Sequence, residues 1–133
     1  MNHKPMLNAY PDSLGGNLGD IVTLLKTEAM QDVFSSFYIL PSLYHSDLDR
    51  GFSVIDYDLN EQLANREDLD QLKNMGIDLK LDFILNHASA QSPQFQDLVE
   101  KGEASAYRDF FIDWNRFWEG HGTMTEEGYI QPE

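Results

Sequence analysis

A chain of 133 residues with 41% apolar and 12% aromatic residues is long enough for one ordinary domain with a core, which excludes a disordered segment. Its formal charge of −14 makes nucleic acid and anionic membranes unfavourable partners, because like charges repel. The absence of cysteine excludes disulfides and thiolate metal sites, and the sequence shows neither a secretory leader nor an apolar run of the roughly 20 residues that span a bilayer. We therefore expect a cytoplasmic protein that binds neither nucleic acid nor a membrane.

Short apolar strands alternate with amphipathic helices in the first part of the chain. One strand is expected over 6–10 and a second over 37–40, each closed by turn residues. Between them, apolar residues at helical spacing over 18–25 predict a helix. After the second strand we expect a long polar loop, roughly 42–64.

A second helix has clear signals at both ends. Asn65 suits the N-cap position, because its side-chain oxygen can accept a hydrogen bond from a backbone N–H of the first turn. Gly76 suits the position just after the helix, where a left-handed conformation is common. The following segment 79–89, LKLDFILNHAS, is a nearly continuous apolar run, which is typical of a parallel strand covered on both faces.

The last third of the sequence predicts helices and an irregular tail. Ser92-Pro93 suits an N-cap followed by proline at the first helical position, and Gly102 ends that helix. Six aromatic residues between 107 and 118 predict a further helical segment. We interpret these rings as core or interface packing in preference to a sugar-binding platform. From Glu119 onwards the chain is expected to be irregular.

The order strand–helix–strand–helix–strand predicts parallel strands joined by right-handed crossovers. Two architectures fit this order, an open doubly wound sheet or part of a (β/α)₈ barrel. A complete barrel requires about 250 residues, so this sequence supplies at most a part of one. Three strands leave open edges, and we therefore expect self-association through them.

Polar residues interrupt and end the third predicted strand. Asp82 shares a strand face with Lys80, and a buried acid is costly unless it is hydrogen-bonded or paired with a cation. Asn86 and His87 fall at the carboxyl end of the strand, the edge where parallel α/β folds place their sites. The residues alone leave two interpretations open, a structural aspartate with two loop polar groups or part of a functional site.

The predicted loop after the second strand carries further candidates. An aromatic ring at Phe52, after Gly51, would lie above the strand ends and either stack on a sugar or pack on the core. An alternating set of side chains could suggest a metal site, but no matching ligand cluster occurs elsewhere in the sequence: His45, Asp47 and Asp49. We expect no metal.

Together these motifs resemble glycoside hydrolase family 13, the α-amylase family. The pattern Asp82-x-x-x-Asn86-His87 after a third strand is similar to the first conserved region of that family. Other segments narrow the resemblance to the sucrose phosphorylase subfamily over almost the whole chain: 8–15 (NAYPDSLG), 39–41 (ILP), 49–52 (DRGF) with 56–57 (DY), and 107–112 (YRDFFI) with 117–118 (FW).

The resemblance implies an α/β fold that is the N-terminal part of a (β/α)₈ barrel. Residues 1–88 would form the first three strands and two helices of the catalytic domain. Residues 89–133 would begin an inserted B-type subdomain.

The resemblance also implies a role for each candidate residue. Asp49 would hydrogen-bond the glucosyl unit in the −1 subsite, Phe52 would stack on it, and His87 would donate a hydrogen bond to a glucosyl hydroxyl. Asp82 and Asn86 would be structural, and Asp82 would pair with an arginine from the fourth strand. No calcium and no other cofactor is implied.

The implied activity is a retaining glucosyl transfer from an α-glucoside such as sucrose to phosphate. In that family the nucleophile ends the fourth strand in an R-x-D motif, the acid lies on the fifth strand and a third carboxylate on the seventh. The sequence departs from this pattern, because its Arg-Asp neighbourhoods at 66–68 and 108–109 fall in predicted helical segments. We therefore expect an N-terminal fragment of such an enzyme, or a truncated relative, that is inactive alone. The alternatives are a stand-alone sugar-binding module and a chain that completes its sheet by dimerising.

Overall fold

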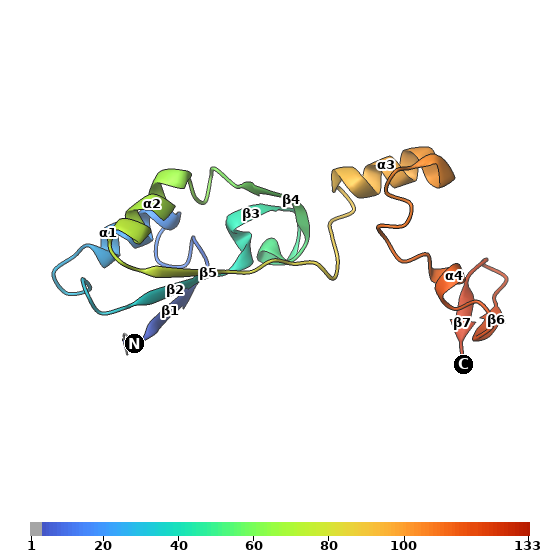
Figure 1. Cartoon of the computed structure of the whole chain (residues 1–133), viewed down its shortest axis with the longest axis horizontal. Coiled ribbons are helices and arrows are strands. Elements are labelled where there is room, and N and C mark those ends of the chain that lie inside the picture. The colour runs from blue at the N-terminus through green and yellow to red at the C-terminus, as the bar shows by residue number, and fades with distance from the viewer. Residues whose placement is uncertain (1–3) are drawn as a thin grey trace. The chain divides into compact units, whose positions relative to one another are not determined.

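The computed structural model describes residues 4–133, with the exception of the side chain of Asp49. The chain forms two compact units, Met1–Ser92 and Pro93–Glu133, whose elements are labelled in Figure 1. Of the helices between residues 4 and 133, none has the length and apolar character needed to cross a membrane. The assignment of 89–133 to an inserted subdomain stays a prediction.

A three-stranded parallel sheet forms the centre of the first unit. Its strands run in the order β1-β2-β5, with the bounds Met6–Ala9, Ser36–Ile39 and Asp78–Leu81. Ala9, Ile39 and Leu81 pair in one cross-strand row, so the three strands end at the same edge. Within the described part of the chain, β1 and β5 are the outer strands of this sheet, and self-association through them stays a prediction.

Both helices of this unit cover the same face of the sheet, as Figure 1 shows. Helix α1 (Leu18–Leu25) lies between β1 and β2 in the chain, and α2 (Arg66–Asn74) lies between β2 and β5. Right-handed crossovers between strands that are added in sequence order all pass on one side of the sheet. A doubly wound sheet has helices on both faces, whereas a closed barrel has them only outside. The architecture is therefore the start of a (β/α)₈ barrel.

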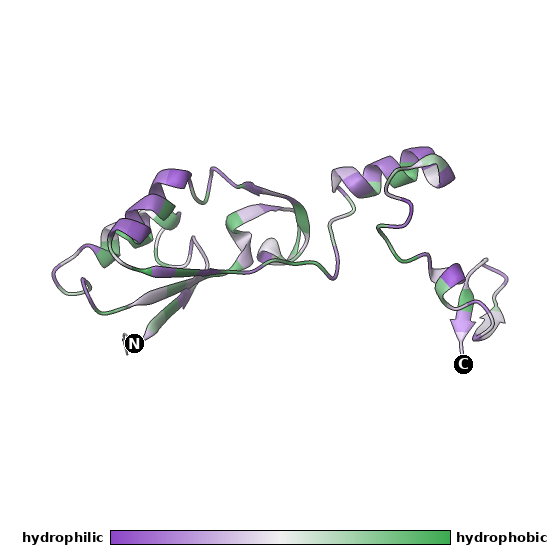
Figure 2. Ribbon diagram, viewed as in Figure 1, coloured by the Kyte–Doolittle hydropathy of each residue, from purple (hydrophilic) through white to green (hydrophobic). Residues whose placement is uncertain are grey.

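The core lies between the two helices and the sheet. Phe37 and Ile39 of the central strand are almost fully buried in it. Helix α2 is mostly hydrophilic, purple in Figure 2, and contributes only an apolar stripe. The buried helical partners are those that helical spacing predicts: Leu18, Ile21, Val22 and Leu25 of α1, and Leu72 of α2. Each such side chain contributes about 1.5–3 kcal/mol when it is removed from water.

The ends of α2 form as the sequence predicts. The Asn65 side chain accepts a hydrogen bond from the Asp68 N–H at 2.9 Å, and the Asp68 carboxylate accepts one from the Asn65 N–H at 3.1 Å. This reciprocal capping box satisfies two backbone N–H groups that have no partner within the helix. Gly76 follows the helix with a φ of 73°, in the left-handed region that favours glycine.

Replacing Asn65 by alanine is expected to lower the free energy of unfolding by about 1 kcal/mol, because the Asp68 N–H loses its acceptor. Equilibrium urea unfolding followed by circular dichroism measures this loss. Asn74→Ala, the same substitution at the exposed last residue of α2, is the matched control and should change stability far less. Equal losses in the two variants would argue against a capping role.

The prediction of a long polar loop after the second strand was wrong. An antiparallel hairpin is present there instead, formed by β3 (Tyr44–Ser46) and β4 (Val54–Leu59). Short 3₁₀ turns precede it and occupy its loop, at Pro41–Leu43 and Asp49–Gly51. A strand of three residues is too short to show a periodic pattern, and acidic residues in β4 weaken the strand signal.

The third strand is shorter than its apolar run predicts. Strand β5 ends at Leu81, and residues 82–88 have no regular secondary structure beyond an isolated bend. Phe83 and Leu85, which belong to that run, are 64% and 75% exposed. The apolar run predicts a strand covered on both faces, whereas β5 is an outer strand among the described residues, and nothing pairs with its free edge to extend it.

The second unit contains two α-helices, a short 3₁₀ turn at Gly102–Ala104 and a hairpin: α3 (Pro93–Lys101), α4 (Trp114–Phe117), β6 (Gly122–Met124) and β7 (Ile130–Pro132). Helix α3 begins and ends where the sequence predicts. The prediction of one aromatic helix was wrong, because only its last part is helical, and the tail predicted to be irregular forms the hairpin. The Trp114 indole N–H donates to the Ile130 carbonyl at 2.7 Å and ties α4 to β7, a tertiary contact that local patterns do not reveal.

Candidate functional site

The candidate residues gather at the edge where the three parallel strands end. Residues 10–13 follow β1, the β3–β4 hairpin follows β2, and residues 82–88 follow β5. Because the strands end in one register row, the three segments leave the sheet next to one another at its carboxyl edge. In a barrel this edge is where the site is built.

A polar cluster lies on the sheet face opposite the helices. Tyr38 pairs with Lys80 across the register, and the Lys80 ammonium lies 4.0 Å from the centre of the Tyr38 ring. The Tyr38 hydroxyl donates to an Asp82 carboxylate oxygen at 2.5 Å. This hydrogen bond raises the pKa of Tyr38, because it favours the protonated phenol. Asp82 was expected to be buried; it is half-buried instead, because it lies just beyond the end of an outer strand.

Asn86 and His87 are exposed and lie in contact, with 2.9 Å between His87 Nδ1 and the Asn86 side-chain oxygen. An amide oxygen only accepts hydrogen bonds, so Nδ1 is the donor in this contact, and Nε2 is then an acceptor in the neutral ring and a donor only in the imidazolium. The contact therefore fixes the orientation of the imidazole and leaves Nε2 for another partner.

The hairpin holds the segment that carries this pair. On one side, the Tyr57 hydroxyl donates to the Ile84 carbonyl, and the Tyr57 and Phe83 ring centres lie 4.6 Å apart. On the other side, the Ser89 N–H donates to the Val54 carbonyl at 2.8 Å. Residues 82–89 are thus fastened before and after the Asn86–His87 pair.

Asp47, in the loop of the hairpin, adds a second attachment. The Ser89 hydroxyl donates to its carboxylate at 2.6 Å. Hydrogen bonds from Ser53 and Ser89 lower the pKa of Asp47, because they favour its charged form. His45, in contrast, pairs with Asp56 at 2.7 Å between Nδ1 and Oδ1. His45 and Asp47 therefore have separate partners, and no group of three or more metal-ligating side chains gathers among the described residues.

Phe52 lies half-buried in the turn 49–52, on the loop of the hairpin. Arg50, in the same turn, pairs with Asp12 and places its guanidinium 4.0 Å from the centre of the Tyr10 ring. The side chain of Asp49 lies outside the described residues. Its expected contact with a sugar stays a prediction.

Several residues that hold the site were not among the predicted site residues. Tyr57, Ser89, Arg50 and Tyr10 all act through partners that are far away in the sequence. Tyr10, Arg50 and Tyr57 fall inside the segments that carry the family resemblance, and this was the available signal. The contacts themselves are tertiary and leave no local pattern.

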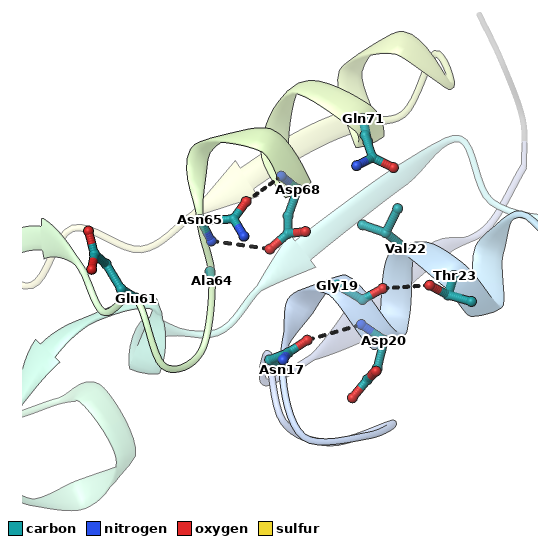
Figure 3. A pocket seen from close by; sticks show the side chains of 10 residues that line it. All are labelled: Asn17, Gly19, Asp20, Val22, Thr23, Glu61, Ala64, Asn65, Asp68 and Gln71. Atoms are coloured by element: carbon teal, nitrogen blue, oxygen red, sulfur yellow. Dashed lines mark hydrogen bonds between the residues drawn. The ribbon is translucent and has the colours of Figure 1, made fainter.

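A polar groove of about 420 Å³ lies between the first turns of α1 and α2, and Figure 3 shows its lining side chains. The groups that dominate it already serve the helix ends. Asn17 accepts from the Asp20 N–H at 3.1 Å, and Asn65 and Asp68 form the capping box. We assign no function to this groove.

Comparison with known proteins identifies the family. The family described as "Alpha amylase, catalytic domain" matches residues 9–128. The chain is 56% identical over 130 residues to a sucrose 6(F)-phosphate phosphorylase of Ilumatobacter coccineus, which covers 98% of this chain and 25% of the relative. It is 40% identical over 118 residues to a sucrose phosphorylase of Streptococcus mutans serotype c, with 87% of this chain and 24% of that protein covered.

A solved structure supports the same assignment. The crystal structure of sucrose 6F-phosphate phosphorylase from Thermoanaerobacter thermosaccharolyticum aligns with a TM-score of 0.82 and 36% identity, over 90% of this chain and 24% of that one. The chain thus spans about a quarter of the length of the relatives it matches. The prediction that it forms the N-terminal part of a (β/α)₈ barrel is confirmed. The chain belongs to glycoside hydrolase family 13, the α-amylase family, and is a sucrose phosphorylase-like member of it.

Proposed function

We propose that Asp49, Phe52 and His87 form part of the −1 subsite of a retaining glycoside phosphorylase, where they bind the glucosyl unit of an α-glucoside. The observation that carries the proposal is the Asn86–His87 pair, exposed at the carboxyl edge of the sheet and fastened on both sides by the hairpin. A pair held in this way is oriented before a ligand arrives, which reduces the entropy lost on binding. The names of the relatives support sucrose or a phosphorylated sucrose as the donor.

In the proposed site each residue has a chemical role. The ring of Phe52 stacks on the apolar face of the sugar, while Asp49 and His87 hydrogen-bond its hydroxyls. The reaction develops positive charge on the sugar ring, and hydrogen bonds to its hydroxyls strengthen in that transition state. Asn86 orients His87, and Asp82 supports the strand end through Tyr38.

The covalent chemistry requires groups outside these residues. In a retaining double displacement a carboxylate attacks the anomeric carbon while an acid protonates the leaving oxygen, and phosphate then displaces the carboxylate. The product is an α-glucosyl phosphate. We propose that both carboxyl groups lie on later strands of the polypeptide, that 1–88 belongs to the barrel and that 89–133 begins an inserted subdomain.

The proposal is tested on the polypeptide that contains these residues. Incubation with sucrose or sucrose 6′-phosphate and inorganic phosphate should release glucose 1-phosphate, which a coupled assay detects. The same assay on residues 1–133 alone should give the blank rate. The proposal would be refuted if residues 1–133 alone released glucose 1-phosphate. It would also be refuted if a polypeptide that contains these residues and the later barrel strands released no glucose 1-phosphate from either donor.

Phe52→Leu is expected to raise KM for the α-glucoside about 10-fold, because the loss of a stacked ring costs about 1–2 kcal/mol of binding free energy. Steady-state kinetics over a range of donor concentrations measures the change. Phe52→Tyr keeps the stacking face and is the matched control, with an expected KM close to that of the parent protein. An unchanged KM in the leucine variant would show that Phe52 packs on the protein and not on the sugar.

A further inference from the structure

Two successive residues of the turn 49–52 have left-handed backbone conformations. Arg50 has a φ of 49° and a ψ of 48°, and Gly51 has a φ of 102°. Glycine adopts such a conformation freely, but a residue with a side chain is disfavoured there. An arginine held in this region therefore needs compensating contacts, and such residues cluster at functional sites.

The backbone of the turn is fixed on one side by close approach to the 3₁₀ turn before β3. A Cβ atom placed on Gly51 would lie 2.2 Å from both the Pro41 carbonyl carbon and the Ser42 nitrogen. Pro41 and Ser42 are themselves buried. The turn thus rests against a buried part of the first unit.

The side chain of Arg50 fixes the turn on the other side. Its guanidinium pairs with Asp12 and lies 4.0 Å from the centre of the Tyr10 ring. Tyr10 is held in turn by Ser13, whose hydroxyl accepts from the Tyr10 N–H at 3.2 Å and whose N–H donates to the Tyr10 carbonyl at 3.1 Å. The anchor at the exit of β1 is therefore itself ordered.

A planar guanidinium can stack on an aromatic ring and pair with a carboxylate at the same time, which an ammonium group cannot do with the same geometry. The Arg50 and Asp12 side chains are 54% and 39% exposed, so solvent weakens their ion pair. The value of the contact lies in the position that it gives to the turn more than in its contribution to stability.

We propose that Arg50 is a positioning residue. Together with Tyr10 and Asp12 it clamps the turn 49–52 to the exit of β1, and so sets the position of Phe52 for the sugar. The evidence for the clamp is the Arg50–Asp12 ion pair and the stacking of Arg50 on Tyr10. Its effect on sugar binding rests on the proposed function.

The test compares Arg50→Gly with Arg66→Gln in the polypeptide that contains these residues. Glycine at position 50 accepts the left-handed backbone, so the variant keeps its fold while it loses the clamp. Arg66, exposed at the start of α2, controls for the loss of one positive charge. Hydrogen exchange of the peptide that covers 47–53 should be faster in Arg50→Gly and unchanged in Arg66→Gln, with exchange in α2 unaffected.

Kinetics supply the functional part of the test. Arg50→Gly should raise KM for the α-glucoside about 5-fold or more with a smaller change in kcat, and Arg66→Gln should leave both as they are. Tyr10→Leu should reproduce the effect of Arg50→Gly, the double variant should add little to either, and Tyr10→Phe, which keeps the ring, should restore the parent KM. Non-additivity of this kind marks residues that act as one unit.

The possible outcomes distinguish a failure of the Arg50 clamp from a failure of the proposed sugar-binding function. Unchanged exchange over 47–53 in Arg50→Gly overturns the clamp, whatever the activity. Faster exchange with an unchanged KM, or additive effects of Arg50→Gly and Tyr10→Leu, overturns its role in sugar binding. A parent protein without phosphorolytic activity refutes the proposed function, and the exchange experiment still decides whether the clamp exists.

Discussion

Replacing His87 by alanine is expected to lower kcat/KM for the α-glucoside about 10²- to 10³-fold, the usual cost of removing one preorganised transition-state hydrogen bond. The imidazole is already oriented by Asn86, and the segment around it is fastened to the hairpin. A group that is held in place before the reaction does not have to reorganise as charge develops on the sugar. For this reason the loss should fall mainly on kcat.

Two further variants define the cause of the loss. His87→Gln keeps a side-chain group that can donate or accept a hydrogen bond and should recover part of the lost activity. His121→Ala removes an exposed histidine of the second unit and should leave kcat/KM unchanged. If His87→Ala retained the parent value, or if glutamine were no better than alanine, hydrogen bonding by His87 would not contribute to the reaction.

The parts of the fold that sequence reasoning predicted are those with local signals. Helix α2 shows this most clearly, because Asn65 and Gly76 are sufficient to place its ends. The parallel sheet followed from the alternation of elements. The two hairpins were missed, because a pair such as β3 and β4 depends on contacts between short strands, and these strands carry no periodic pattern of their own.

In the candidate site, too, residues with a local sequence signal were predicted and residues that act through tertiary contacts were not. Asn86 and His87 could be predicted, because polar residues at the carboxyl end of an apolar strand are typical of a functional site in parallel α/β folds. Their supports do not stand out: Tyr57 reaches Ile84 across 27 residues. Arg50 reaches Asp12 across 38 residues. A single sequence shows which residues are unusual, but it does not show which distant partner holds them.

Gly51→Ala is expected to be the most damaging single substitution in the turn. Its Cβ would lie 2.2 Å from two backbone atoms of Pro41 and Ser42, and backbone atoms cannot rotate away as the end of a side chain can. The φ of 102° adds strain to this overlap. We expect a loss of about 2–4 kcal/mol in the free energy of unfolding, together with weaker sugar binding as the turn moves.

Gly76→Ala provides the matched control, because it separates strain from overlap. Gly76 also has a left-handed backbone, with a φ of 73°, but nothing lies within 4 Å of the position of its Cβ. Alanine there should cost about 1 kcal/mol, from backbone strain alone. Equilibrium urea unfolding of both variants gives the comparison. Equal losses of unfolding free energy in the two variants would mean that the turn 49–52 can move to accommodate a Cβ at position 51. Its contact with Pro41 and Ser42 would then not fix the position of Phe52.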